Sequence, residues 1–301
     1  TPWSATMLGR LVKEHTDIPA GVFNVITAED PRTVGDQLVG DPRVDMVSFT
    51  GSTAVGRHIM ARAAATVKKV FLELGGKSAN ILLDDADFGN ALLSALGVCY
   101  HAGQGCAIAT RLLVPKSRQA EAEALLKTYF GYIQYGNPQA EDQIMGPLVN
   151  ERQHGRVLGY IERGKQEGAR LLVGGGRPAH LPKGYYVEPT VFVDVTNDMT
   201  IAQEEIFGPV LSVIAFEDDE DAIRIANDSI YGLSGAVWSA DEARALGVAR
   251  RIRTGTINVN GGNFYAADAP FGGYKQSGLG REMGPEGFEE YLETKTIAIG
   301  C

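Results

Sequence analysis

The chain has 301 residues, of which 44% are hydrophobic and 22% are charged, and its formal net charge is −9. This composition is typical of a soluble globular protein that is long enough to form two domains. The acidic balance, without a cluster of Lys and Arg, excludes a surface for nucleic acid, and no apolar run reaches the ~18 residues of a membrane span.

Helix-like and strand-like stretches alternate over the first 74 residues. The expected elements, in chain order, are helix 3–15, strand 22–26, helix 31–40, strand 44–51, helix 52–65 and strand 68–74. Strands that alternate with helices indicate βαβ units and a parallel sheet.

A second series of the same kind follows. The expected elements are strand 78–85, helix 87–102, strand 111–115, helices 117–131 and 150–168, strands 169–175 and 209–217, helix 219–228, strand 233–239, helix 241–252 and strand 255–260. The Gly-rich loop 261–282 is longer than a simple connection needs, which is typical of a functional loop. The tail 293–300 has a β-like pattern but no evident partner strand.

The chain contains three cysteines, Cys99, Cys106 and Cys301. An odd number without CxxC spacing predicts neither a disulfide framework nor a zinc site, and free thiols favour a reducing, cytoplasmic setting. Cys99 lies on the apolar stripe of helix 87–102 and is expected in the core. The sequence shows no signal peptide. It begins without a Met and almost inside a helix, so we expect the N-terminus to be a cut end.

The stretch FTGSTAVG (49–56) lies at a junction between a strand and a helix. Gly51 allows a ligand to approach the backbone closely, and Ser52 or Thr53 can cap the helix. Free N–H groups at the helix start can then bind an anion such as pyrophosphate. The stretch matches neither GxGxxG nor a Walker loop, so an ordinary capped helix is the alternative.

The stretch LELGGKS (72–78) places Glu73 at the end of an apolar strand. It is not a P-loop, because Phe71 occupies the position of the required earlier glycine. A carboxylate in an apolar setting has a raised pKa, which suits a general base. A salt-bridged or solvent-facing glutamate is the alternative.

The stretch HAGQGCAIATR (101–111) surrounds Cys106 with small residues. Gly103 and Gly105 are expected to end the preceding helix and to let backbone N–H groups turn toward a substrate, as in an oxyanion hole. Cys106 is therefore a candidate nucleophile, although a free cysteine is more often structural. His101 is expected at the surface, and the histidines show no metal-ligand spacing.

The stretch QEEIFGPVLS (203–212) joins two glutamates to an aromatic residue. Glu205 can hydrogen-bond a sugar hydroxyl, and Phe207 can pack on a flat ring. The alternative is a turn that leads into a buried strand, and this stretch taken by itself favours that alternative.

Together with PFGGYKQSGLGRE (270–282) and YLETKT (291–296), these stretches resemble the aldehyde dehydrogenase superfamily in their order and separation. The resemblance extends over essentially all 301 residues. It implies an α/β fold that combines part of a Rossmann-like dinucleotide-binding domain with an α/β catalytic domain. The boundaries that we expect are 1–74 for the dinucleotide-binding part, 75–270 for the catalytic domain, and 271–301 for a return to the cofactor side that ends in an oligomerisation strand.

The resemblance implies that an aldehyde is oxidised to a carboxylic acid by NAD(P)+, with NAD favoured over NADP. Cys106 would be the nucleophile that forms a thiohemiacetal and then a thioester, and Glu73 would be the general base that activates water. The implied cofactor contacts are Gly51, Ser52, Gly56, Leu74, Glu205 on the nicotinamide-side ribose, and Phe207 on the nicotinamide ring. A small-molecule aldehyde would be the substrate, and a homodimer or homotetramer would be the assembly.

The chain also departs from the family pattern. Family members are markedly longer, and the resemblance places ahead of Thr1 the first strands of the dinucleotide fold, an Asn for the oxyanion and a Lys for the adenosine ribose. Two alternatives therefore stay open. One is a catalytically silent fragment or structural protein that keeps the fold. The other is a CoA-acylating semialdehyde dehydrogenase, although relatives of that kind tend to lack a glutamate at the position of Glu73.

Overall fold

The structure is a computed structural model that describes residues 2–263 and 265–300. The chain divides into two compact units. The smaller unit comprises Thr1–Val47 and Arg57–Val70, and the larger comprises Ser48–Gly56 and Phe71–Cys301. All the residues singled out above as site candidates belong to the larger unit, so the site can be described within it.

The elements of the first 73 residues follow the expected alternation closely. They are α1 (Pro2–His15), α2 (Pro31–Gly40), β1 (Met46–Thr50), α3 (Thr53–Ala63), the 3₁₀ turn η1 (Ala64–Thr66) and β2 (Lys69–Glu73). Two residues define where α2 begins. The Asp30 side chain accepts a hydrogen bond from the Arg32 N–H (3.1 Å), and Pro31 fits the first helical position because it needs no N–H partner there.

Two stretches with a strand-like sequence do not form strands. Residues 22–26 and 293–300 are irregular and mostly exposed. A strand needs a neighbour to pair its N–H and C=O groups, and among the described residues neither stretch has one. A short apolar sequence was therefore not enough to predict a strand at 22–26.

The strands β1, β2 and β12 (Gly278–Leu279) form a three-stranded sheet in that order. β12 pairs antiparallel with β2, and Gly278 stands opposite Glu73. This pairing returns the glycine-rich loop 261–282 to the strand that carries Glu73.

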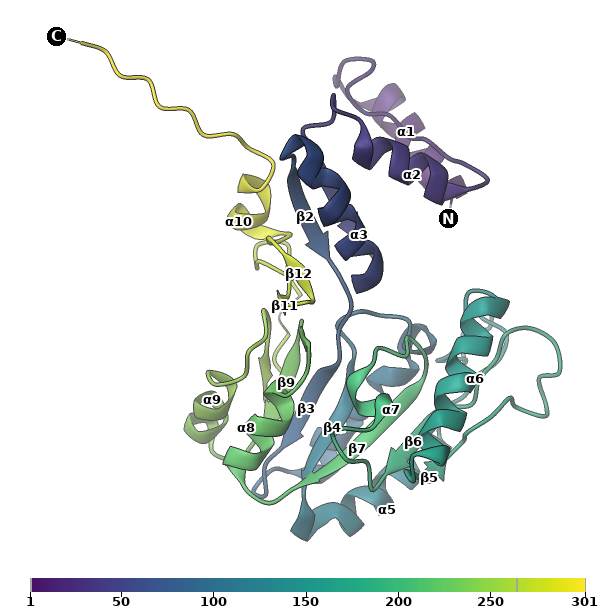
Figure 1. Ribbon diagram of the computed structural model, residues 1–301. Helices are drawn as coiled ribbons and strands as arrows, with labels where there is room; N and C mark the ends of the chain where they lie inside the picture. The colour runs from purple at the N-terminus through teal and green to yellow at the C-terminus, as the bar shows by residue number, and fades with distance from the viewer. Residues whose placement is uncertain (1, 264, 301) are drawn as a thin grey trace. The chain divides into compact units, whose positions relative to one another are not determined.

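The larger unit is built on a seven-stranded sheet of order β10-β9-β3-β4-β7-β6-β5 (Figure 1). Its strands are β3 (Ser78–Leu82), β4 (Ala109–Pro115), β5 (Arg170–Val173), β6 (Thr190–Val193), β7 (Val210–Phe216), β9 (Gly235–Trp238) and β10 (Asn258–Val259). Every pair is parallel except β5 with β6. The expectation of an α/β fold with a parallel sheet is confirmed, although β6 has no counterpart among the strands expected from the sequence.

The remaining elements connect and cover this sheet. They are α4 (Phe88–Ala91), η2 (Leu92–Gly103), η3 (Lys116–Arg118), α5 (Gln119–Gly131), α6 (Glu151–Gln166), α7 (Thr200–Gln203), β8 (Tyr231–Gly232), α9 (Glu242–Ala249), β11 (Tyr274–Lys275), α10 (Gly284–Glu289) and α8 (Asp219–Asn227). β8 pairs antiparallel with β11. α8 begins after Asp218, whose side chain accepts a hydrogen bond from the Asp221 N–H (2.9 Å). It then packs against β7 and β3.

The core of the larger unit lies in its central strands. Ile81 and Leu82 in β3 and Leu112, Leu113 and Val114 in β4 are fully buried. Parallel strands that are covered on both faces carry continuous apolar runs. These two strands were predictable for that reason, and they provide a rigid base for the loops at their ends.

The helix expected at 87–102 is shorter and less regular than its sequence suggests. After α4 the chain continues as the 3₁₀ segment η2, and the backbone leaves the helical region at Tyr100 (ψ 135°), followed by His101 and Ala102 with φ of 52° and 53°. The helix therefore breaks before the glycines that were expected to break it. Cys99 is fully buried in the core, as predicted.

Candidate catalytic site

The candidate residues gather around residues 75–78, the turn between β2 and β3. Glu73 ends β2 directly before this turn. The backbone N–H of Gly76 donates a hydrogen bond to Glu205 Oε1 (3.1 Å). A Cβ on Gly76 would lie 2.4 Å from the carbonyl oxygen of Cys106, so this position has no room for a side chain. One turn thus brings three separate segments of the chain together.

Cys106 lies half-buried in the loop between η2 and β4. Burial raises the pKa of its thiol to about 12, and the neighbouring Glu73 and Glu205 carboxylates act in the same direction. The N–H of Ala107 opposes this shift by stabilising the thiolate. The thiol is consequently protonated at neutral pH and needs a base before it can act as a nucleophile.

Glu73 is the candidate for such a base. It is 2% exposed, and neither of its carboxylate oxygens has a hydrogen-bond partner among the described residues. Burial raises the pKa of Glu73 to about 7, while the interaction with the Cys106 thiol opposes that rise. A buried carboxylate without partners is costly to keep ionised. Its free oxygens can accept a proton from the thiol or from a water near neutral pH.

Glu205 and Phe207 are held by α6. Arg156 donates a hydrogen bond to the Glu205 carbonyl (2.6 Å), and Gln153 donates one to the Phe207 carbonyl (2.8 Å). Burial raises the pKa of Glu205, and the Gly76 N–H is the largest influence that opposes it. Phe207 adopts a φ of 58°, which a non-glycine residue rarely does. This loop is therefore fixed in an unusual conformation by its neighbours.

The loop that carries Cys106 packs tightly on the turn after Phe207. Gly103 has a φ of 71°, and a Cβ there would lie 2.1 Å from the Gly208 carbonyl oxygen. Gly103 is thus required for close packing in the structure, in addition to any role of the loop's N–H groups. A cleft of about 630 Å³ lies beside this contact and is lined by His101 and Phe207, among others. His101 is exposed, as expected.

The start of α3 adjoins β2. The Gly51 N–H donates a hydrogen bond to the Glu73 carbonyl (3.0 Å). The Ser52 hydroxyl accepts a hydrogen bond in the first turn of α3 (3.4 Å), which confirms the expected cap. A Cβ on Gly56 would lie 2.6 Å from the Leu74 side chain, so the glycine lets the helix approach the strand closely. The structure places these four proposed cofactor contacts around the backbone of Glu73.

Two residues of the site were missed in the sequence. Arg111 is 2% exposed, and it donates four hydrogen bonds of 2.9 Å each. Their acceptors are the carbonyls of Lys77, Ile225 and Ala226 and the Asn197 side chain. Lys77 is also buried, at 2% exposed. A charged residue at the start of the apolar run RLLVP was the available indication for Arg111.

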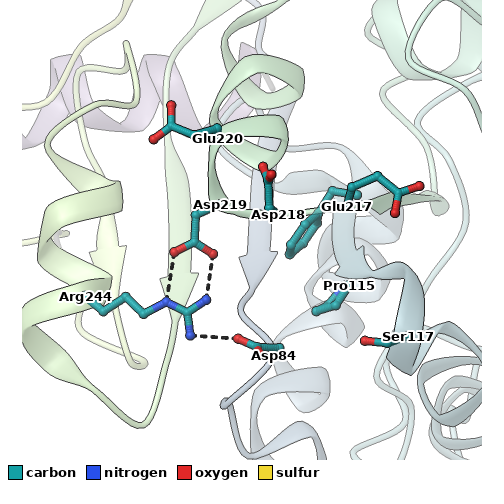
Figure 2. A pocket seen from close by; sticks show the side chains of 9 residues that line it. Asp84, Pro115, Ser117, Glu217, Asp218, Asp219, Glu220 and Arg244 are labelled. Atoms are coloured by element: carbon teal, nitrogen blue, oxygen red, sulfur yellow. Dashed lines mark hydrogen bonds and ion pairs between the residues drawn. The ribbon is translucent and has the colours of Figure 1, made fainter.

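A separate crevice lies at the opposite edge of the seven-stranded sheet (Figure 2). It has a volume of about 420 Å³ and follows the carboxyl ends of β3, β4 and β7, whereas Cys106 precedes β4. Arg244 lies at its wall and donates hydrogen bonds to Asp219 and Asp84 at 2.7–2.8 Å. Arg244, the cation of this crevice, is thus already paired with carboxylates.

Within residues 2–263 and 265–300, no group of three or more His, Cys, Asp and Glu side chains is arranged to hold a metal ion. No helix in those ranges is long and apolar enough to cross a bilayer.

A family model and the sequences of known proteins both match this chain over nearly its whole length. The Aldehyde dehydrogenase family model matches residues 1–297. A Staphylococcus saprophyticus protein that carries an aldehyde dehydrogenase name is 48% identical over 99% of this chain, which spans 62% of that relative's length.

Solved structures of two aldehyde dehydrogenases are similar to this chain in both sequence and fold. A mutant of aldehyde dehydrogenase C from Pseudomonas syringae, solved with NAD+ and octanal, is 46% identical with a TM-score of 0.95, over 98% of this chain and 60% of its own. A Mycobacterium tuberculosis aldehyde dehydrogenase solved with NAD+ is 47% identical with a TM-score of 0.92, over 96% of this chain and 59% of its own.

Proposed function

Because the chain belongs to the aldehyde dehydrogenase family, we propose that the protein oxidises an aldehyde to a carboxylic acid with NAD(P)+. The observation that carries this proposal is the Glu73 carboxylate, which is buried and interacts directly with the Cys106 thiol. A base with a pKa of about 7 next to a thiol matches covalent catalysis followed by hydrolysis.

The residues of this chain would act in sequence. The Cys106 sulfur, once Glu73 has taken its proton, bonds to the aldehyde carbon, and the carbonyl π electrons move to oxygen to give an oxyanion that backbone N–H groups can stabilise. The carbonyl then re-forms as a thioester while a hydride leaves the carbon. NAD(P)+, when bound, supplies the acceptor for that hydride, which no side chain can replace.

Hydrolysis completes the cycle. Glu73, after it has released the first proton, takes a proton from a water molecule, whose oxygen bonds to the thioester carbon. The C–S bond then breaks, the Cys106 sulfur leaves, and the carboxylic acid is released. The raised pKa of Glu73 suits both proton transfers, because the group exchanges protons readily near neutral pH.

The chain offers matching groups for the cofactor. Gly51 and Ser52 are exposed at the start of α3, where N–H groups can meet a pyrophosphate. Glu205 would accept hydrogen bonds from the nicotinamide-side ribose, and Phe207, beside its cleft, would pack on the nicotinamide ring. Gly56 and Leu74 would complete the contact. NAD is favoured over NADP because the similar solved structures contain NAD+.

We also propose a setting and an assembly. A reactive thiol requires a reducing compartment, which favours the cytoplasm. The exposed, irregular stretch 293–300 would pair as a strand with a second subunit in a homodimer or homotetramer. The domain boundaries 1–74, 75–270 and 271–301 belong to the same proposal. Deletion of the last nine residues should dissociate the assembly, which size-exclusion chromatography with light scattering would show.

The proposal is tested by the Cys106→Ala variant of the protein. NADH formation from an aldehyde should disappear in this variant, while the matched control Cys99→Ala should retain it. Rapid iodoacetamide labelling of Cys106 that an aldehyde suppresses would support the same assignment. Activity in Cys106→Ala would refute the mechanism, and inactivity of the unaltered protein would favour the silent-fragment alternative.

The CoA-acylating alternative makes a different product. It would give an acyl-CoA, and turnover would depend on added CoA. The Glu73 carboxylate beside Cys106 favours hydrolysis instead. Carboxylic acid formed without CoA, measured by mass spectrometry, would support the proposal, and strict dependence on CoA would contradict it.

A further inference from the structure

Three neighbouring strands of the seven-stranded sheet begin near Cys106. The strands β9, β3 and β4 are adjacent in that sheet and run parallel to one another. Ser234 directly precedes β9, Ser78 begins β3, and Ala107 lies between Cys106 and the start of β4. Because parallel strands begin at the same edge of a sheet, residues that are far apart in the sequence meet here.

The Ser234 hydroxyl joins the other two strand ends. Ser234 is 2% exposed. Its Oγ donates a hydrogen bond to the Ala107 carbonyl (2.6 Å) and is also hydrogen-bonded to Ser78 Oγ (2.8 Å). A hydroxyl carries one proton and a carbonyl can only accept, so the Ser234 proton goes to Ala107 and the Ser78 hydroxyl donates to Ser234. This buried hydroxyl is therefore used both as a donor and as an acceptor.

The peptide unit between Cys106 and Ala107 is held on both sides. The Cys106 carbonyl oxygen lies so close to Gly76 that a Cβ there would be 2.4 Å away from it. The next carbonyl along the chain, that of Ala107, is the one bonded to Ser234. Because a peptide unit is planar, a fixed Cys106 carbonyl also fixes the direction of the Ala107 N–H. The backbone beside the sulfur therefore has little freedom to rotate.

The direction of the Ala107 N–H affects the chemistry of the thiol. Burial is the largest cause that raises the pKa of the Cys106 thiol, and the Glu73 and Glu205 carboxylates, which are the charged groups that face it, act in the same direction. The hydrogen bond from the Ala107 N–H lowers that pKa, because it stabilises the thiolate. A sulfur beside two carboxylates thus depends on this backbone donor when it becomes negatively charged.

We propose that Ser234 is a positioning residue, whose buried hydroxyl fixes the backbone at Ala107 so that the N–H of that residue stays directed at the Cys106 sulfur. The inference rests on the proposed function, in which this sulfur is the nucleophile. Ser234 acts through Ala107 and takes no part in the bonds that form and break. Its bond to Ser78 ties it to β3, whose residues Ile81 and Leu82 are fully buried, so the hydroxyl is held by a rigid strand.

Loss of this hydroxyl has an effect whose direction identifies its cause. In Ser234→Ala the Ala107 carbonyl is released, and the Ala107 N–H can turn away from the sulfur. The thiolate is then less favoured, so alkylation of Cys106 should become slower. A general loosening of the fold would instead expose Cys106 and the buried Cys99, and alkylation of both would become faster.

The experiment measures the rate of iodoacetamide labelling of Cys106 at several values between about pH 7 and about pH 9, with tandem mass spectrometry to distinguish it from Cys99. One hydrogen bond changes an equilibrium by about three- to tenfold. Labelling in Ser234→Ala should therefore be about three- to tenfold slower than in the unaltered protein at each pH. This change displaces the rate profile by about half to one pH unit toward higher pH.

Ser239→Ala is the matched control, because Ser239 directly follows the other end of β9. Ser239 is 5% exposed, and its Oγ donates a hydrogen bond to Asp85 (2.7 Å). The control therefore also loses a buried hydroxyl with its hydrogen bond, but at a site that does not hold Ala107. It should label Cys106 at the rate of the unaltered protein.

The outcomes separate this inference from the proposed function. An unchanged or faster rate in a folded Ser234→Ala protein would overturn the inference, and so would equal slowing in Ser239→Ala. If Ser234→Ala does not fold, Ser234→Cys decides instead, because its thiol is only a weak donor; slower labelling of Cys106 supports the inference and an unchanged rate overturns it. If Cys106 of the unaltered protein reacts no faster than Cys99, the proposed function fails and the inference fails with it.

Discussion

Glu73→Gln removes a base whose pKa lies near the working pH. With a pKa of about 7, Glu73 is ionised to about one tenth at pH 6, about half at pH 7 and about nine tenths at pH 8. Steady-state turnover that depends on the ionised form should therefore rise about tenfold between about pH 6 and pH 8. The amide keeps the shape of the side chain but cannot take a proton, which should cost ~10²–10⁴-fold in turnover.

The assay is stopped-flow detection of NADH after mixing with an aldehyde. Because the proposal gives Glu73 both proton transfers, the Gln variant should lose the burst of one NADH per Cys106 as well as the steady state that follows, and a retained burst would confine Glu73 to hydrolysis. The rise of the remaining turnover with pH should also disappear. An unchanged pH profile in the Gln variant would refute the reasoning altogether.

The raised pKa of Glu73 also affects the free energy of unfolding of the protein. The pKa of Glu73 moves from 4.5 to about 7 on folding, so the protonated form is favoured in the folded protein. Stability is then greatest at low pH and is lost as the pH rises through about 7. The full shift corresponds to about 3 kcal/mol at most. Urea unfolding should show Glu73→Gln to be more stable than the parent at about pH 8, with little difference at about pH 4. Equal stability at both would contradict the raised pKa.

Four other changes should have distinct effects. Cys99→Ala should lower the free energy of unfolding by about 1 kcal/mol through lost packing, and a loss of activity at unchanged stability would contradict this. Gly76→Ala would place a Cβ 2.4 Å from the Cys106 carbonyl oxygen and so displace the Cys106 loop, which should slow iodoacetamide labelling of Cys106. Labelling at the normal rate would show that the turn at residues 75–78 can move to accommodate the methyl group. Arg111→Met should destabilise the protein in urea by about 3 kcal/mol or more, since four acceptors lose their donor; a smaller change would mean that water replaces it. The 301-residue chain, which spans 60% of the Pseudomonas syringae enzyme, should bind NAD+ more weakly than that enzyme in isothermal titration, and equal affinity would contradict this expectation.

The sheet was largely predictable because its central strands have a clear physical cause. A strand that is buried on both faces must be apolar throughout, as in ANILL and RLLVP, and β3 and β4 occupy those stretches. The capping residue at the start of α3 was equally visible, since its side chain acts on a neighbour a few residues away. Local causes of this kind can be recognised in a single sequence.

Causes that act between distant segments could not be recognised in the same way. Residues 22–26 have a suitable pattern for a strand, but the described residues provide no neighbour for it. The helix that precedes Cys106 breaks at Tyr100 rather than at the glycines. The sequence analysis gave Lys77 no role, and its burial depends on segments that are far away in the chain. The sequence pointed to Glu73, Cys106 and Glu205 individually, while the structure adds the turn at which they meet.

The position of the crevice in Figure 2 bears on how the protein could be modified in the laboratory. β4 runs from Ala109 to Pro115 between the Cys106 loop and that crevice, and seven extended residues separate its ends by about 20 Å. Ser117 follows the carboxyl end of β4, whereas Cys106 precedes its amino end. A dye, an affinity tag or a surface linker attached at Ser117 would therefore lie at the opposite end of this strand from the Cys106 sulfur. Immobilisation through that edge should leave the opposite edge open to small molecules in solution.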